Sequence, residues 1–174
     1  MPGEINLAGD WAGEYRQYDQ HYPIQATFAQ EGTILNGSMI DDEPEHELPL
    51  AEVARFPGED ERVVAMLRSI LPDGPTGPIF VISRVPKDST LTGTINGNWV
   101  YFDKSYQGSC FGGFRVGDEV VGDAYENHVV HYSGRLTPDG GEIEGRWWIS
   151  ANPGAVERLE GSFLLRRKAS GPES

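Results

Sequence analysis

A short glycine-centred phrase recurs six times along the chain. In each copy, Gly stands two positions after one apolar or aromatic residue and two positions before another. In an extended segment these three residues share a face, so the glycines belong to the buried face of predicted strands. A buried Gly marks a bend, a bulge or a bulky group opposite, and closed antiparallel barrels need such bends. The copies are residues 11–15, 35–39, 91–95, 132–136, 143–147 and 159–163.

Alternating apolar and polar residues extend beyond these phrases and predict about eight or nine short strands, mostly joined to their sequence neighbours. The strongest hairpin signal is Asn96-Gly97, whose turn is expected to place both residues at positive φ. Many short strands with one interrupting helix favour an up-and-down barrel over a sandwich. We therefore predict an all-β fold, a single antiparallel up-and-down β-barrel of about 8 strands with one short helix in an insertion.

The composition changes over residues 43–78, which we interpret as a helical insertion between strands of one domain spanning 1–174. Glu59 to Leu71 has helical spacing, with acidic residues in its first turn and Pro72 after it. We expect the apolar stripe of this helix to pack against the barrel or cover one of its mouths. The Gly-rich stretch 107–123 is expected to be a long loop, in which a hairpin is one option.

The charge balance limits the partners that the protein can have. The chain has 14 Lys and Arg against 27 Asp and Glu, a formal net charge of −13, so nucleic acid and anionic membrane surfaces would be repelled. Its single Cys excludes an internal disulfide and suits a reducing compartment. The sequence contains neither an apolar span nor a signal-peptide pattern at its start. We expect a cytoplasmic protein.

The two ends of the chain resemble the calycin superfamily, which comprises the lipocalins, the fatty-acid-binding proteins and the avidins. Gly9-Asp10-Trp11 resembles the Gly-x-Trp at the start of the first strand of these barrels, and Arg166 or Arg167 ends the last predicted strand. The resemblance implies that an Arg of the last strand covers Trp11 and closes one barrel end. A cation–π contact of this kind contributes about 0.5 to 2 kcal/mol. The resemblance also implies a cavity for a small, largely apolar ligand.

Strand alternation places a set of aromatic residues and one histidine inside the barrel. His128 shares the inner face with Tyr132, whereas His131 points outward, so a metal site using both histidines is disfavoured. Because Gly alternates with bulky residues on this face, the glycines are expected to keep a slot open for a ligand; a barrel packed solid by the same side chains is the alternative. The predicted ligand-binding residues are Tyr15, Phe28, His128, Tyr132, Trp147 and Phe163.

Small-molecule binding inside the barrel is the leading function on this evidence. The first alternative is an enzyme that uses the same pocket, with His128 as acid or base and Glu126 or Asp103 as its partner. The second is an acidic protein-interaction module with a solid barrel. No catalytic residue, cofactor or metal site is assigned, because neither Cys110 nor the acidic run 41–47 has a supporting pattern.

Outward-facing apolar residues suggest one further partner. By the same alternation, Trp148 and Leu164 lie on the outer face of neighbouring predicted strands. An outer apolar patch is explained either by a homo-oligomer or by packing under the insertion. Both explanations stay open at the level of sequence.

Overall fold

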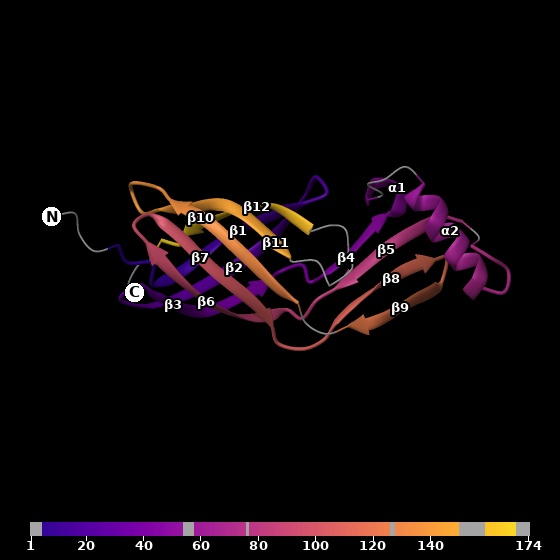
Figure 1. Cartoon of the computed structure of the whole chain (residues 1–174), viewed down its shortest axis with the longest axis horizontal. Helices are drawn as coiled ribbons and strands as arrows, with labels where there is room; N and C mark the ends of the chain where they lie inside the picture. Colours follow the sequence, from indigo (N-terminus) through magenta and orange to yellow (C-terminus); the bar gives the residue numbers. More distant parts are fainter. Residues whose placement is uncertain (1–4, 54–57, 76, 126–127, 150–158, 170–174) are drawn as a thin grey trace. The chain divides into compact units, whose positions relative to one another are not determined.

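The computed structural model describes residues 5–53, 58–75, 77–125, 128–149 and 159–169. The chain forms two compact units, each drawn with its elements labelled in Figure 1. One unit comprises residues 1–43, 86–108 and 127–174, and the other comprises 44–85 and 109–126. Within the described ranges, no helix is long and apolar enough to cross a membrane.

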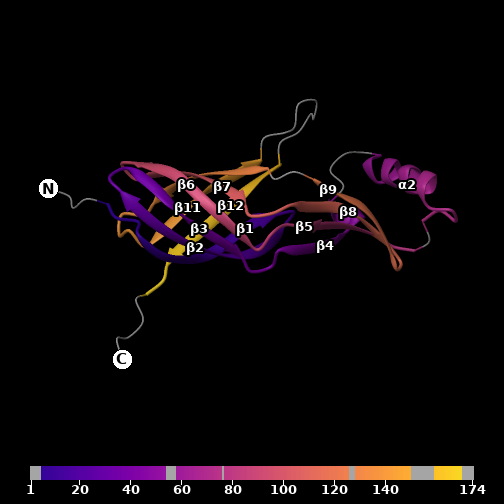
Figure 2. The same ribbon diagram turned by 90° about the horizontal axis from the view of Figure 1, so that it is seen from below.

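The first unit is a closed antiparallel barrel of eight strands, which confirms the predicted fold class. Each strand pairs with the barrel strand that follows it in the chain, and the last closes on the first, so the connections are those of an up-and-down barrel (Figure 2). The strands in chain order are β1 (Gly9–Gln17), β2 (Gln20–Glu31), β3 (Ile34–Asp41), β6 (Asp88–Asn96), β7 (Trp99–Tyr106), β10 (Val129–Leu136), β11 (Glu142–Ile149) and β12 (Leu159–Arg167).

The hairpin between β6 and β7 differs in detail from the prediction. Asn96 and Trp99 are paired, so Gly97 and Asn98 are the two turn residues. Gly97 has a φ of 61°, and neither Asn96 nor Asn98 has a positive φ. The Asn-Gly dipeptide therefore marks the turn correctly but lies one position earlier in it than expected.

The second unit is a four-stranded antiparallel sheet with two helices, and the sequence analysis did not predict this sheet. Its strands run in the order β4 (Glu45–Pro49), β5 (Ile79–Arg84), β8 (Cys110–Val116) and β9 (Glu119–Tyr125). Helix α1 (Leu50–Val53) follows β4, and α2 (Glu59–Ile70) ends one residue before the predicted helix. On the apolar stripe predicted for this helix, Leu67 is buried and Ile70 is exposed.

The Gly-rich stretch, expected to be a long loop with a hairpin as one option, forms the β8–β9 hairpin of this second sheet, so the hairpin option is confirmed and the long loop is wrong. Gly113 and Gly122 are paired across the two strands. A Cβ on Gly113 would lie 2.7 Å from the Gly122 Cα, so these strands approach more closely than side chains would allow. Glycine composition is typical of loops, but here it permits a close strand pair.

Within the barrel, the inward-facing glycines also bring strands together rather than leaving a slot. Gly134 and Gly145 are paired between β10 and β11. A Cβ on Gly145 would lie 2.0 Å from the Ser133 carbonyl oxygen and 2.5 Å from the Gly134 Cα. The space that these glycines free is therefore occupied by backbone of the neighbouring strand, which lets the sheet coil into a narrow barrel.

Aromatic rings in mutual contact fill the middle of the barrel. Phe102 stacks on Tyr132 with ring centroids 4.7 Å apart, and Phe163 meets Tyr132 edge-on at 5.1 Å. Phe28 lies 5.4 Å from Phe102 and 6.4 Å from Trp11. Edge-to-face and stacked contacts of this kind contribute about 0.5 to 1.5 kcal/mol each beyond the area they bury.

One end of the barrel is closed by Trp11 and Arg167. The Trp11 ring lies 4.5 Å below the Arg167 guanidinium carbon, and its indole N–H donates a hydrogen bond to the Leu7 carbonyl. Arg167 also donates hydrogen bonds to the carbonyls of Asn6 and Ala8. Arg166, the other candidate for this role, points outward and pairs with Glu142 at 2.9 Å.

Replacing Gly145 by Ala tests the close approach of β10 and β11. The added methyl group would meet backbone atoms that have no rotamer to change, so we expect the free energy of unfolding to fall by about 3 kcal/mol or more. The measurement is urea unfolding followed by tryptophan fluorescence. Gly141→Ala is the matched control, because its Cβ would meet only the Asp139 side chain, at 3.3 Å. Equal stability of the two variants would contradict the close approach.

Candidate functional site

A buried ion pair lies inside the barrel at the end away from Trp11. Asp41 is the last residue of β3, and Lys104 follows Val100 and Phe102 on the inner face of β7. The Lys104 ammonium donates hydrogen bonds to both Asp41 carboxylate oxygens, at 2.6 and 2.8 Å. The two side chains are 1 % and 2 % exposed. A complete charge pair is thus withdrawn from water within a largely apolar core.

Three tyrosines lie near this pair, and a fourth, Tyr22, contacts one of them. The Lys104 ammonium lies 4.6 Å from the centre of the Tyr106 ring. Burial, followed by the nearby Asp41 carboxylate, raises the pKa of both Tyr15 and Tyr132. Burial also raises the pKa of Tyr22, whose ring centre is 5.0 Å from that of Tyr15. All three phenols are therefore neutral at physiological pH.

His128 stands immediately before β10 at the same end of the barrel. Its ring meets Tyr106 edge-on at 5.5 Å. Burial, followed by the positive charge of Lys104, lowers the pKa of His128, so the imidazole is neutral at pH 7. Of its two predicted partners, Glu126 lies outside the described residues. Asp103 is on the outer face of β7, where its carboxylate lies 2.6 Å from the His131 ring nitrogen.

The structure brings three of the six predicted ligand-binding residues, Tyr15, His128 and Trp147, to this barrel end, and Tyr132 joins this end to the middle of the barrel, because its ring contacts Phe102 and Phe163 while its phenol lies near Asp41. Tyr15, Tyr132 and Trp147 are buried and His128 is half-buried. The Trp147 ring meets Tyr15 edge-on at 5.8 Å, and its indole N–H donates a hydrogen bond to the Arg16 carbonyl. Phe28 and Phe163 lie instead in the aromatic cluster at the middle of the barrel.

Sequence reasoning missed Asp41 and Lys104, the most buried charged groups described. Asp41 opens the acidic run 41–47, to which the sequence analysis assigned no site. Lys104 shares the inward parity of Val100 and Phe102, and this alternation is the signal that identifies it. Because Lys and Asp are rarely buried unless they are paired, the alternation argues for a partner inside the barrel.

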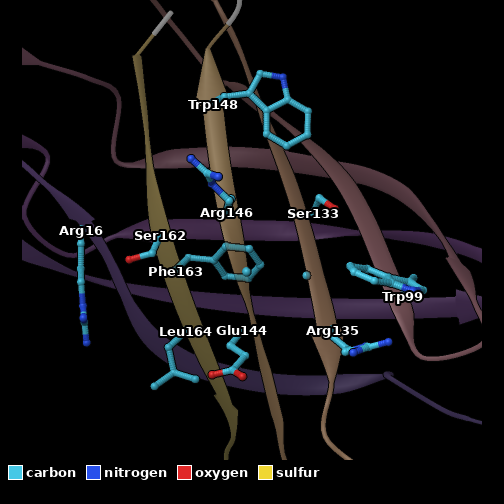
Figure 3. Close-up of a pocket in the computed structure, with 12 residues that line it drawn as sticks. Arg16, Trp99, Ser133, Arg135, Glu144, Arg146, Trp148, Ser162, Phe163 and Leu164 are labelled. Atoms are coloured by element: carbon cyan, nitrogen blue, oxygen red, sulfur yellow. The ribbon is translucent and has the colours of Figure 1, made fainter.

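A groove with a volume of about 630 Å³ lies on the outer face of β1, β7, β10, β11 and β12 (Figure 3). Trp99 and Trp148 flank it, and three arginines with one glutamate line it. A smaller hollow of about 270 Å³ adjoins Trp148 and contains the His131–Asp103 pair. Trp148 and Leu164, which the sequence placed outside the barrel, both line the larger groove.

Other candidate chemistry has less support. In the described part of the chain, no group of three His, Cys, Asp or Glu side chains is placed to hold a metal ion. Cys110 is 1 % exposed in the second unit. No family model matches the chain, and neither the curated proteins nor the solved structures searched contain a match. The eight-stranded closed barrel is compatible with a calycin-like fold, and the function has to be argued from the sites.

Breaking the buried ion pair tests its energetic role. We expect Lys104→Met to destabilise the barrel by about 3 to 5 kcal/mol, because the Asp41 carboxylate would remain buried without its partner. Replacing both residues, with Asp41→Leu and Lys104→Met, removes both charges, and most of the loss is then expected to disappear. Urea unfolding followed by tryptophan fluorescence reports on the barrel, since all four tryptophans lie in its unit. Lys168→Met, which removes an exposed lysine, is the control. If Lys104→Met and Lys168→Met lower the free energy of unfolding equally, the buried pair is dispensable for stability.

The lowered pKa of His128 predicts a loss of stability in mild acid. Above about pH 6.5 the imidazole is neutral in both states; below it, the unfolded chain binds a proton that the folded chain does not, so unfolding becomes favoured. The loss continues until the pH reaches the folded-state pKa. We expect His128→Asn to lose less stability than the wild type between about pH 7.5 and about pH 5.5. If the free energy of unfolding changes with pH in the same way in both proteins, the protonation of His128 is not coupled to folding.

Proposed function

We propose that the barrel binds a small, largely apolar or aromatic molecule at the end that carries Asp41 and Lys104. The observation that carries this proposal is the complete ion pair buried among tyrosines. A barrel of about eight strands can be filled by apolar side chains alone, and a buried ion pair seldom stabilises a fold more than such packing does. Groups with perturbed pKa values cluster at functional sites. The arrangement therefore supports a site for recognition.

The same residues define what such a ligand would meet. The rings of Tyr15 and Trp147 supply aromatic surface, and Tyr15, Tyr22 and Tyr106 retain 9 %, 7 % and 8 % exposure at the edge of the core. Phenol groups that stay protonated can donate hydrogen bonds to a carbonyl or hydroxyl oxygen of the ligand. Neutral His128 offers one donor and one acceptor. Lys104 and Asp41 hold each other in place through their hydrogen bonds and would form a polar base for the ligand site.

The solid-barrel alternative also has one observation in its favour. The contacts among Phe28, Phe102, Tyr132 and Phe163 fill the middle of the barrel, and this favours an acidic interaction protein without an internal ligand. The two functions differ in whether a small molecule occupies the polar end. An enzyme using His128 would need the same occupancy before any chemistry.

Native mass spectrometry of freshly purified protein tests the proposal. We expect a fraction of the wild-type chain to carry the additional mass of a small molecule. Tyr15→Phe keeps the ring and removes the hydroxyl, so it is expected to lower that fraction several-fold. Tyr101→Phe is the matched control, because Tyr101 is 43 % exposed on the outer face of the barrel. The solid barrel would be favoured if the wild-type protein has the mass of the chain alone and keeps that mass after incubation with a library of small aromatic compounds.

A further inference from the structure

We propose a second binding site, on the outside of the barrel, that takes a small aromatic oxyanion such as a ring-bearing carboxylate or sulfonate. The site is the groove over β1, β7, β10, β11 and β12. Its volume of about 630 Å³ is within the usual range of small-molecule sites, roughly 300 to 1,000 Å³. It lies on the opposite side of the barrel wall from the proposed interior site and does not depend on it: Ser133 lines the groove, whereas its neighbour Tyr132 faces inward.

Strand register gives the groove a low floor between two tryptophans. Ser133 is paired with Arg146, and Arg146 with Ser162, so one row across the sheet has small residues on both sides of a single arginine. Trp99 belongs to the row on one side and Trp148 to the row on the other. Figure 3 shows Ser133 between the two indole rings, with the Arg146 side chain on the neighbouring strand.

The inner-face glycines contribute to the hollow from behind. Gly134 and Gly145 both line the groove through their backbone, and the two residues are paired. Because neither has a side chain, no Cβ separates β10 from β11 at this point. The glycines that bring these strands together inside the barrel thus also form part of the surface of the groove.

The charge of the groove is opposite to that of the chain. Arg16, Arg135 and Arg146 line it together with a single acidic residue, Glu144, although the whole chain has a formal net charge of −13. A small anion can reach such a local positive site, whereas an extended polyanion would also meet the negative surface around it. Guanidinium groups offer paired donors that match the geometry of a carboxylate.

The arginines are held in ways that leave them usable by a ligand. The Arg135 guanidinium carbon lies 4.8 Å from the centre of the Trp99 ring, a contact that orients the group and leaves its N–H donors at the edge. Arg146 pairs with Glu160 at 3.2 Å, and both side chains are largely exposed. Exposed ion pairs of this kind contribute little to stability, so a ligand oxyanion can replace the Glu160 carboxylate. A ring attached to the anion would pack beside Trp99 or Trp148.

Fluorescence titration with two related dyes tests the assignment. Anilinonaphthalene sulfonate carries the oxyanion, and phenylnaphthylamine has nearly the same rings without it. We expect the double variant Arg135→Gln and Arg146→Gln to bind the sulfonate at least tenfold more weakly than the wild type and to bind phenylnaphthylamine equally well. Arg166→Gln is the matched control, because Arg166 is an exposed, ion-paired arginine of the same barrel outside the groove. Tyr15→Phe, which alters the interior site, is expected to leave sulfonate affinity unchanged.

Three results would overturn the proposal. The first is an equal loss of sulfonate affinity in Arg166→Gln, which would indicate general charge attraction. The second is an equal loss of phenylnaphthylamine, which would indicate an apolar surface without anion recognition. The third is a wild-type dimer in sedimentation that the double variant converts to monomer while neither dye binds, which would show that a second copy of the chain covers the groove.

Discussion

The close approach of neighbouring strand backbones is the constraint on which the barrel depends. At Gly145 and Gly134 two strands meet at distances that no side chain would permit, so each strand can bend sharply while its ladder of hydrogen bonds continues. The narrow interior that results is filled by aromatic rings in direct contact. On the outside, the backbone of the same two glycines lines the groove between Trp99 and Trp148. Interior packing and outer groove therefore share one pair of glycines.

Along its axis the barrel interior changes from apolar to polar. At one end a cation–π contact between Trp11 and Arg167 joins the first strand to the last. Rings occupy the middle, and the other end contains the Asp41–Lys104 pair with its tyrosines. The interior is therefore apolar towards Trp11 and polar towards Asp41 and Lys104. This asymmetry links the packing to the proposed function.

Sequence alternation was sufficient to predict the barrel and the inward orientation of Tyr132 and Trp147, because a period of two residues is a local property of a strand. The second sheet was missed because the glycines of β8 and β9 have the composition of a loop, and their pairing is visible only across two strands. Lys104 was missed because lysine is normally exposed, and its burial depends on Asp41, which is distant in sequence. The outer groove depends on how the barrel strands are aligned with one another. Turn residues and amino-acid composition do not determine this register.

The second sheet is built from two separate insertions, and this arrangement has a consequence for folding kinetics. The β3–β6 pair can form only when the chain closes the long loop between Asp41 and Asp88. Pairing of Glu45 with Arg84 in the second sheet shortens that loop to a few residues at each end, and pairing of Cys110 with Tyr125 does the same between β7 and β10. Since the entropic cost of closure rises with loop length, early formation of these ladders would speed the closing of the barrel. We therefore expect the insertions to assist barrel closure during folding, although they interrupt the barrel in sequence.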